Sequence, residues 1–234
     1  MTRKGESMNH YCFDCDDTLY DSIEPFVRTM AEFIPDLSLD MKTFYKEYRK
    51  FGDDVFDLLQ KGTITLADSG IYRIYKVCQK WGIPFTLEQS ADFQERYNYW
   101  QNHLTMDPDL KEWLDKTKAD LWILSNGPDA HQRAKMKALG LERWFQPDHI
   151  FTSGQIGAAK PEGRAFAAVT EDPADWFYIG DNYINDMEGA KAAGWQTIHY
   201  NRHNGPTGPA ADHVVSTGRQ LADLLEQLEA EDHV

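Results

Sequence analysis

Residues 9–20 have the sequence NHYCFDCDDTLY, and the first half of this stretch decides the fold. Asn9–Asp14 is a short, mostly apolar run that ends at acidic residues, which is typical of a buried strand. After Met106, strand-like and helix-like segments alternate, and such alternation predicts a parallel sheet with right-handed crossovers. The strands predicted there are Leu121–Leu124, His149–Thr152, Trp176–Ile179, Gln196–His199 and His213–Val215.

The stretch between the first strand and Met106 differs, because its apolar residues recur at helical spacing throughout. We therefore predict an α/β protein with a Rossmann-like parallel-sheet core, residues 1–21 and 104–234, and an inserted all-helical cap, residues 22–103. A last helix near Thr217–Ala230 carries one stripe of leucines. The helices predicted for the cap are Pro25–Phe33, Leu39–Phe51, Asp53–Gln60, Leu66–Trp81 and Leu87–Gln101.

Charge and composition exclude several classes of protein. Lysine and arginine total 24 against 38 aspartates and glutamates, and the formal charge of −14 has the wrong sign for following a nucleic acid polymer. No run of 18 apolar residues exists, so we expect no membrane span. Nothing in Met1–His10 resembles a secretory signal, and three cysteines fit reduced thiols, so we expect a cytoplasmic protein. The oligomeric state stays open.

Cys12 and Cys15 form a Cys-x-x-Cys pair, a spacing that also occurs in redox and zinc sites. In an extended strand, residues three apart point to opposite faces, and their Cα atoms lie about 10 Å apart. That separation exceeds the reach of a disulfide. Zinc would need more ligands than Cys78 and scattered histidines offer, so we expect neither a redox nor a zinc site here.

Two carboxylates follow the first strand. Asp14 and Asp16 are two residues apart, and side chains at that spacing in an extended chain point the same way. One carboxylate can attack as a nucleophile while the other carries protons, provided that their surroundings separate their pKa values. The alternative is a solvated acidic turn, Asp16-Asp17-Thr18, that caps a helix.

The segment Phe13-Asp14-Cys15-Asp16-Asp17-Thr18-Leu19-Tyr20 resembles the first motif of the haloacid dehalogenase superfamily, in which a strand ends in Asp-x-Asp-x-Thr. In the phosphatases of that family the first Asp is the nucleophile and the second is the acid/base. The resemblance therefore implies that Asp14 attacks phosphorus and that Asp16 carries the proton. Residues 13–22 also resemble the opening of the pyrimidine 5′-nucleotidase type within this superfamily.

Two further segments resemble the second and third motifs of the same family. The apolar run from Leu121 ends in Ser125-Asn126, and Ala159-Lys160-Pro161 precedes a predicted helix. The resemblance implies that Ser125, Asn126 and Lys160 bind the phosphoryl group, with the Lys160 ammonium neutralising its charge. By themselves, Ser125 could instead cap the helix that Pro128 begins, and Lys160 could be a solvated loop lysine.

The fourth motif resembles Gly180-Asp181-Asn182-Tyr183-Ile184-Asn185-Asp186, which follows the predicted strand Trp176–Ile179. Converging carboxylates repel one another unless a cation lies among them, and oxygen ligands suit Mg²⁺. We therefore expect Mg²⁺ as cofactor, with Asp14, Asp16, Asp181 and Asp186 as candidate ligands. Asp186 could bind directly, through water, or instead orient Lys160. Without the resemblance, Asp181 is an ordinary loop residue and Asp186 belongs to a helix's first turn.

The four motifs occur in the family's order, and three of them follow predicted strands, where ligands bind in open α/β sheets. The resemblance implies a capped, Mg²⁺-dependent phosphate-monoester hydrolase with an aspartyl-phosphate on Asp14. Three alternatives stay open. They are a phosphomutase, although Asp17-Thr18 differs from the Gly-Val usual in those mutases; a metal-independent dehalogenase; and a binding protein without catalysis on the same fold.

The expected partner is a small phosphorylated metabolite. Residues 41–100 hold 13 of the 30 Phe, Tyr and Trp residues in the chain. Most recur at helical spacing and are predicted to form the cap's own core, while one or two could stack on a base. The predicted core residues include Phe44, Tyr48, Phe51, Tyr72 and Tyr75. We therefore favour a nucleoside monophosphate. His199 and His203 are interpreted as solvated loop histidines and left outside the site.

Overall fold

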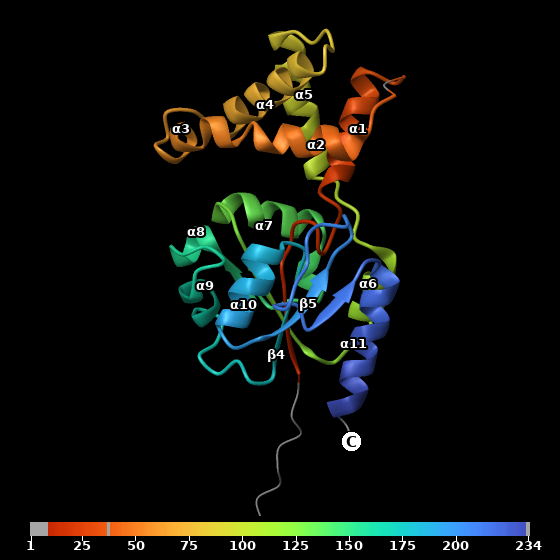
Figure 1. Cartoon of the computed structure of the whole chain (residues 1–234), viewed down its shortest axis with the longest axis vertical. Coiled ribbons are helices and arrows are strands. Elements are labelled where there is room, and N and C mark those ends of the chain that lie inside the picture. The colour runs from red at the N-terminus through yellow and green to blue at the C-terminus, as the bar shows by residue number, and fades with distance from the viewer. Residues whose placement is uncertain (1–8, 37, 233–234) are drawn as a thin grey trace, which may run out of the picture. The chain divides into compact units, whose positions relative to one another are not determined.

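The computed structural model describes residues 9–36 and 38–232, and the chain divides into two compact units (Figure 1). One unit comprises residues 22–104 and is helical. The other combines residues 9–21 with residues 105–232 and contains the sheet. Each unit is described below by itself.

The sheet has six strands in the order β3-β2-β1-β4-β5-β6, and every neighbouring pair is parallel. The predicted α/β fold with a parallel sheet is therefore confirmed. The first strand lies in the middle of the sheet, between strands that follow it by more than 100 residues. The strands are β1 His10–Phe13, β2 Asp120–Ser125, β3 Ile150–Thr152, β4 Trp176–Gly180, β5 Gln196–Tyr200 and β6 His213–Val215.

Helices cover both faces of this sheet. In Figure 1, α8, α9 and α10 lie on one side of it and α6 and α11 on the other. Leu221, Leu225 and Leu228 of the predicted leucine stripe are buried, and α11 packs along α6. The helical segments are α6 Pro108–Leu114, α7 Asp129–Ala138, η2 Leu141–Arg143, η3 Pro147–His149, α8 Ser153–Ile156, α9 Gly163–Ala167, the π-helix η4 Tyr183–Glu188, α10 Gly189–Ala192 and α11 Gly218–Asp232.

Side-chain caps fix where the helices of the other unit begin. Thr65 and Thr86 each form a capping box at the start of a helix. Asp40 accepts hydrogen bonds from the backbone N–H groups of Lys42 and Thr43, so the second helix begins two residues later than predicted. The segments are α1 Ile23–Phe33, α2 Met41–Lys50, η1 Asp53–Val55, α3 Phe56–Gln60, α4 Leu66–Lys80 and α5 Leu87–Gln101.

Aromatic side chains form the core of the helical unit. Phe26 lies at its centre, with ring contacts to Phe44, Tyr48, Phe93 and Tyr97, all of them buried. Among the aromatic residues predicted to form this core, Phe44 and Tyr48 are buried in it and Phe51 packs against it, whereas Tyr72 and Tyr75 are not part of it.

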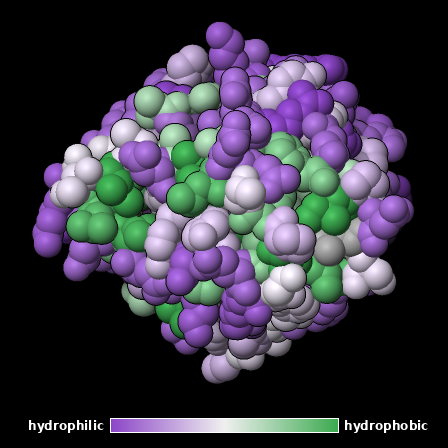
Figure 2. Space-filling model, turned by 90° about the horizontal axis from the view of Figure 1, so that it is seen from above, coloured by the Kyte–Doolittle hydropathy of each residue, from purple (hydrophilic) through white to green (hydrophobic). Residues whose placement is uncertain are grey.

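Polar side chains predominate on the face shown in Figure 2, and apolar ones gather there in small separate groups. Within residues 9–36 and 38–232, no helix combines the length and the apolar character that a membrane span needs.

Candidate active site

Four sequence motifs converge at the carboxyl edge of the sheet. Asp14, Ser125 and Asp181 lie at the ends of β1, β2 and β4, which are parallel neighbours. The backbone N–H of Asp14 donates to the carbonyl of Ile179, with an N–O distance of 2.8 Å, so the end of β1 is tied to the end of β4. This edge is where open α/β sheets bind ligands.

A buried ammonium lies at the centre of the site. The Nζ atom of Lys160 is 2.9 Å from Asp14 Oδ1 and 2.7 Å from Asp186 Oδ1. It also donates to the hydroxyl of Tyr178 at 2.6 Å, and that hydroxyl donates to the carbonyl of Leu124 at 2.7 Å. The interpretation of Lys160 as a solvated loop lysine is excluded, because only 2% of its side chain is exposed.

This arrangement shifts the pKa values of both partners. Burial alone would lower the pKa of Lys160, but the attraction of Asp14 and Asp186 outweighs it and raises that pKa. The lysine is therefore charged. Burial raises the pKa of Asp14 to about 7, and repulsion from Asp186 and Asp16 adds to the effect, while Lys160 opposes it. The candidate nucleophile thus needs more positive charge nearby than Lys160 supplies.

Three carboxylates are placed to hold a metal ion. One oxygen from each of Asp14, Asp181 and Asp186 lies within 4.8 Å of the others. Burial, followed by repulsion from Asp17, Asp14 and Asp186, raises the pKa of Asp181 to about 9. A cation among these oxygens would remove the repulsion, and a hard divalent ion prefers carboxylate oxygens. The residues present therefore fit a metal site.

The Asp186 carboxylate fits at the site only because residue 180 is a glycine. A Cβ atom at Gly180 would lie 2.3 Å from Asp186 Oδ2, so a larger residue would displace the carboxylate. Its Oδ2 accepts from the backbone N–H of Asn182 at 2.9 Å, while Oδ1 accepts from Lys160. Of the roles left open for Asp186, this geometry favours orienting Lys160.

Ser125 and Asn126 have different surroundings. The hydroxyl of Ser125 is buried and makes no hydrogen bond to any described residue, and Pro128, not Ser125, is the N-cap of α7. Such a hydroxyl is available to a ligand. The amide of Asn126 instead exchanges two 2.9 Å hydrogen bonds with the backbone of Lys160. Asn126 therefore joins two motifs and positions Lys160.

Asp16 does not join the three carboxylates. Its oxygens accept from Lys135 Nζ at 2.5 and 2.6 Å, from Gln132 Nε2 at 3.2 Å and from the hydroxyl of Tyr20. Burial would raise the pKa of Asp16, but Lys135 and these hydrogen bonds outweigh it and lower that pKa. Because β1 ends at Phe13, the extended geometry from which a shared face was predicted does not continue through Asp16, although Asp16 is close enough to raise the pKa of Asp14.

Several residues of the site were not expected from the sequence. Lys135 and Gln132 lie three apart on α7, a helix spacing that places both on one face, but no motif indicated them. Tyr178 lies in a predicted strand, but nothing in the sequence indicated that its hydroxyl would contact Lys160. The interpretation of His199 as solvated is wrong, because it is fully buried and its Nε2 bonds the carbonyl of Asp181 at 2.9 Å. Its Nδ1 lies 3.0 Å from the hydroxyl oxygen of Thr207, so both ring nitrogens have hydrogen-bond partners.

His203 and the cysteines lie outside this set. His203 pairs with Asp17 at 3.4 Å and Asp21 at 3.5 Å, and these hydrogen bonds raise its pKa to about 9. Cys12 and Cys15 are buried and unpaired, and burial raises the pKa of both thiols. A raised thiol pKa opposes redox or metal chemistry there.

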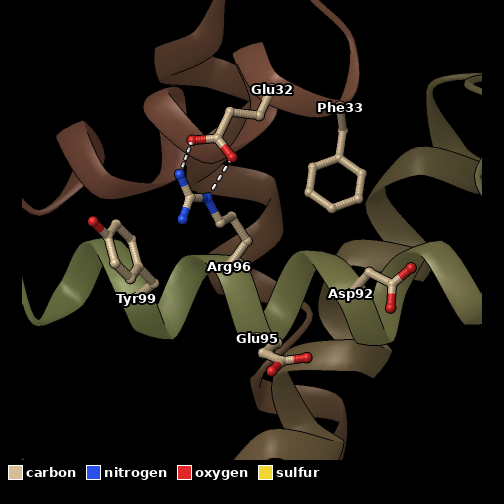
Figure 3. A pocket seen from close by; sticks show the side chains of 6 residues that line it. All are labelled: Glu32, Phe33, Asp92, Glu95, Arg96 and Tyr99. Carbon is tan, nitrogen blue, oxygen red and sulfur yellow. Dashed lines mark hydrogen bonds and ion pairs between the residues drawn. The ribbon is translucent and has the colours of Figure 1, made fainter.

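A pocket on the helical unit has the wrong charge for a phosphate ester (Figure 3). Arg96 is its only basic lining residue, and both hydrogen bonds of that side chain in Figure 3 go to Glu32. The lining residues are Glu32, Phe33, Asp92, Glu95, Arg96 and Tyr99. Three of them are acidic, so the sheet edge is the better candidate for a phosphoryl group.

Comparison with known proteins agrees with this geometry. Residues 8–194 match the haloacid dehalogenase-like hydrolase family. The chain belongs to this family. The matched region of this haloacid dehalogenase-like hydrolase includes all four motifs and the whole helical unit.

Individual relatives of this hydrolase have different activities. The phosphoserine phosphatase of Thermus thermophilus is 30% identical over 148 residues, which cover 60% of this chain and 55% of the relative. The pyrimidine 5′-nucleotidase PynA of Streptococcus pneumoniae is 30% identical over 126 residues, which cover 51% of this chain and 52% of that relative. The chain thus spans about half the length of these curated relatives.

A solved structure shows the same fold. The L-2-haloacid dehalogenase from Xanthobacter autotrophicus superposes with a TM-score of 0.66 at 19% identity, over 94% of this chain and 98% of that one. At this identity the likeness concerns the fold alone.

Proposed function

We propose that this hydrolase is a Mg²⁺-dependent phosphate-monoester hydrolase that forms an aspartyl-phosphate on Asp14. The observation that carries the proposal is the buried Asp14 carboxylate, which faces the Lys160 ammonium at 2.9 Å and lies within 4.8 Å of two further carboxylates. A nucleophilic carboxylate, a fixed cation and a metal-binding group at one sheet edge suit in-line displacement at phosphorus.

The roles of the residues follow from their positions. An oxygen of ionised Asp14 attacks phosphorus while the bond to the leaving alkoxide breaks. Lys160 neutralises charge on the phosphoryl oxygens, and the unpartnered Ser125 hydroxyl donates a hydrogen bond to one of them. Bound Mg²⁺, held by Asp14 and Asp181 with Asp186 close by, would supply further charge stabilisation and keep Asp14 ionised.

Asp16 enters most directly in the second half of the reaction. Its lowered pKa favours the carboxylate form, which can take a proton from the water that attacks the aspartyl-phosphate. That water then cleaves the P–O bond to Asp14 and releases phosphate. The proton gained in this step is the one that Asp16 gives to the leaving alkoxide in the next turnover, so the proton count balances. A leaving group that is stable as an anion needs no such proton, and attack by Asp14 on such a substrate should proceed without help from Asp16.

A small phosphorylated metabolite is the proposed substrate, with nucleoside monophosphates ranked first. The likeness to a pyrimidine 5′-nucleotidase supports that ranking, and the likeness to a phosphoserine phosphatase adds phosphoserine as a competitor. The aromatic content of the helical unit supports it less than the sequence suggested, since most of those rings lie in that unit's own core or pack against it.

The alternatives account for less of the site. A metal-independent dehalogenase would have no use for Asp181 beside Asp14 and Asp186, since attack on carbon needs no cation among them. A phosphomutase would require the phosphoryl group to be returned to a second substrate oxygen, and nothing described at the site selects sugar over water.

The test is a turnover assay with wild type and Asp14→Asn on pyrimidine and purine monophosphates, phosphoserine, sugar phosphates and phosphoglycolate. We expect phosphate release with Mg²⁺, none in excess chelator, and a loss of several orders of magnitude in the variant. Full activity in chelator, or a variant with more than a tenth of wild-type activity, would refute the proposal. Halide release from a haloacid would then point to a dehalogenase.

A further inference from the structure

We propose that Lys135 is a positioning residue that holds the Asp16 carboxylate for the proton it takes from water during hydrolysis of the aspartyl-phosphate. This inference rests on the proposed function. It starts from a residue outside all four motifs, whose ammonium contacts both oxygens of Asp16 at 2.5 and 2.6 Å.

The pair is buried on the lysine side. Only 6% of the Lys135 side chain is exposed, against 30% for Asp16. A buried ammonium is stable only when a carboxylate and hydrogen bonds compensate for the water it has lost. Asp16 is the one carboxylate that ion-pairs with Lys135 among the described residues. The position of the Lys135 ammonium therefore fixes the position of the Asp16 carboxylate.

The helix that carries Lys135 is itself anchored to the site. Gln132, one turn earlier on α7, donates through Nε2 to the carbonyl of Asn126 at 2.6 Å and to Asp16 at 3.2 Å. Asn126 in turn exchanges hydrogen bonds with the backbone of Lys160. Asp16 is thus held from the same loop that positions Lys160, which faces Asp14.

Each oxygen of Asp16 is also shared between two donors. Oδ1 accepts from Lys135 and from the Tyr20 hydroxyl, and Oδ2 accepts from Lys135 and Gln132. These donors come from α7 and from the turn after β1, so the carboxylate is held from two sides. These four hydrogen bonds occupy about as many acceptor sites as a carboxylate has, so the water's proton is taken where the longest of them, from Gln132 at 3.2 Å, opens, while Lys135 keeps the carboxylate oriented.

The test separates the two half-reactions with 4-nitrophenyl phosphate and Mg²⁺. Nitrophenolate leaves without a proton, so kcat/KM reports attack by Asp14, while kcat includes hydrolysis of the aspartyl-phosphate. For Lys135→Met we expect kcat to fall about 100-fold, the order of a general-base contribution, with kcat/KM within threefold of wild type. A burst approaching one nitrophenolate per enzyme should precede the slow turnover.

Three controls complete the design. Lys137→Met removes an exposed lysine two residues along the same helix and should leave both parameters unchanged. Lys135→Arg keeps the charge and should restore kcat to within tenfold. Asp16→Asn should reproduce the slow second phase, and adding Lys135→Met to it should change kcat no further, as expected when one residue acts through the other.

The outcomes are distinct. If Lys135→Met lowers kcat and kcat/KM by the same factor without a burst, or lowers neither, Lys135 is structural and the inference is overturned. If that variant does not fold, Lys135→Gln is measured under the same criteria. If wild type releases phosphate from no monoester, the proposed function fails instead, and the failure is recognised before any variant is made.

Discussion

Without a metal ion, the protein should lose stability as the pH rises from 5 to 8. A carboxyl group whose pKa is higher in the folded state binds more protons there than in the unfolded state, so raising the pH favours unfolding. Asp14 has an ordinary pKa of 3.8 and a folded pKa of about 7. From these two values its contribution becomes less favourable by roughly 2.5 kcal/mol between pH 5 and pH 8, and Asp181, with a folded pKa of about 9, acts in the same direction.

Mg²⁺ should reverse this trend, because the cation competes with protons for the same carboxylates and binds more tightly as the pH rises. The assay is thermal unfolding at pH 5 and pH 8, in chelator and in excess Mg²⁺. For a chain of this size, about 2.5 kcal/mol corresponds to roughly 5–10 °C in Tm. We expect a gain of that order from Mg²⁺ at pH 8 and a small gain at pH 5.

His203 complicates the chelator series, because its raised pKa also makes stability fall over this pH range. The gain from Mg²⁺ isolates the carboxylate contribution, and Asp14→Asn provides the matched control, in which that gain should shrink. Equal gains at pH 5 and pH 8, or an Asp14→Asn variant that gains as much as wild type, would refute the electrostatic reasoning.

Three further changes test individual residues. Ser125→Ala should leave Tm unchanged, since the hydroxyl makes no hydrogen bond to a described residue. The variant should lower kcat/KM about 10- to 100-fold, the range expected for one hydrogen bond to a charged group. An unchanged kcat/KM would remove Ser125 from the site. Gly180→Ala should displace the Asp186 carboxylate and lower kcat/KM at least about tenfold, comparable to the loss of one charged hydrogen bond. Wild-type kinetics would contradict the predicted clash between a Cβ atom at position 180 and Asp186 Oδ2, which would lie 2.3 Å apart. His203→Gln should cost about 1 kcal/mol of stability at pH 6, after solvent screening of its partly exposed ion pairs, and little at pH 10. The stability gained from its raised pKa is present below about pH 6.5 and is lost as the pH rises through about 9. Equal losses in urea unfolding at both pH values would argue against a charged histidine.

The sequence was sufficient for the fold because the sheet's signals are local. Each strand from Leu121 onward is a short apolar run between helical segments, and all five lie within one residue of their predicted bounds. The start of α2 was displaced by the cap at Asp40, a side-chain bond that hydrophobic spacing does not report. Alternation and periodicity reveal burial, but hydrogen bonds decide the ends of elements.

The site was only partly predictable for the same reason. Asp14, Lys160, Asp181 and Asp186 lie in motifs and meet at the sheet edge. The partner of Asp16 could not be found from spacing, because Lys135 is 119 residues away and looks like any other lysine near the end of a helix. A buried lysine is recognised only when the fold shows what surrounds it.

The central place of β1 has a consequence for how the chain folds. Its partners are β2, paired from Asp120, and β4, paired from Trp176, so neither ladder is local in sequence. During synthesis, β1 emerges first and stays without sheet neighbours until the helical unit and β2 have followed, and the edge beside Asp181 is completed only by β4. Contacts of such long range slow folding, because the intervening loop must close before pairing stabilises it. The helical unit, residues 22–104, is a compact cluster of its own and can fold in the meantime.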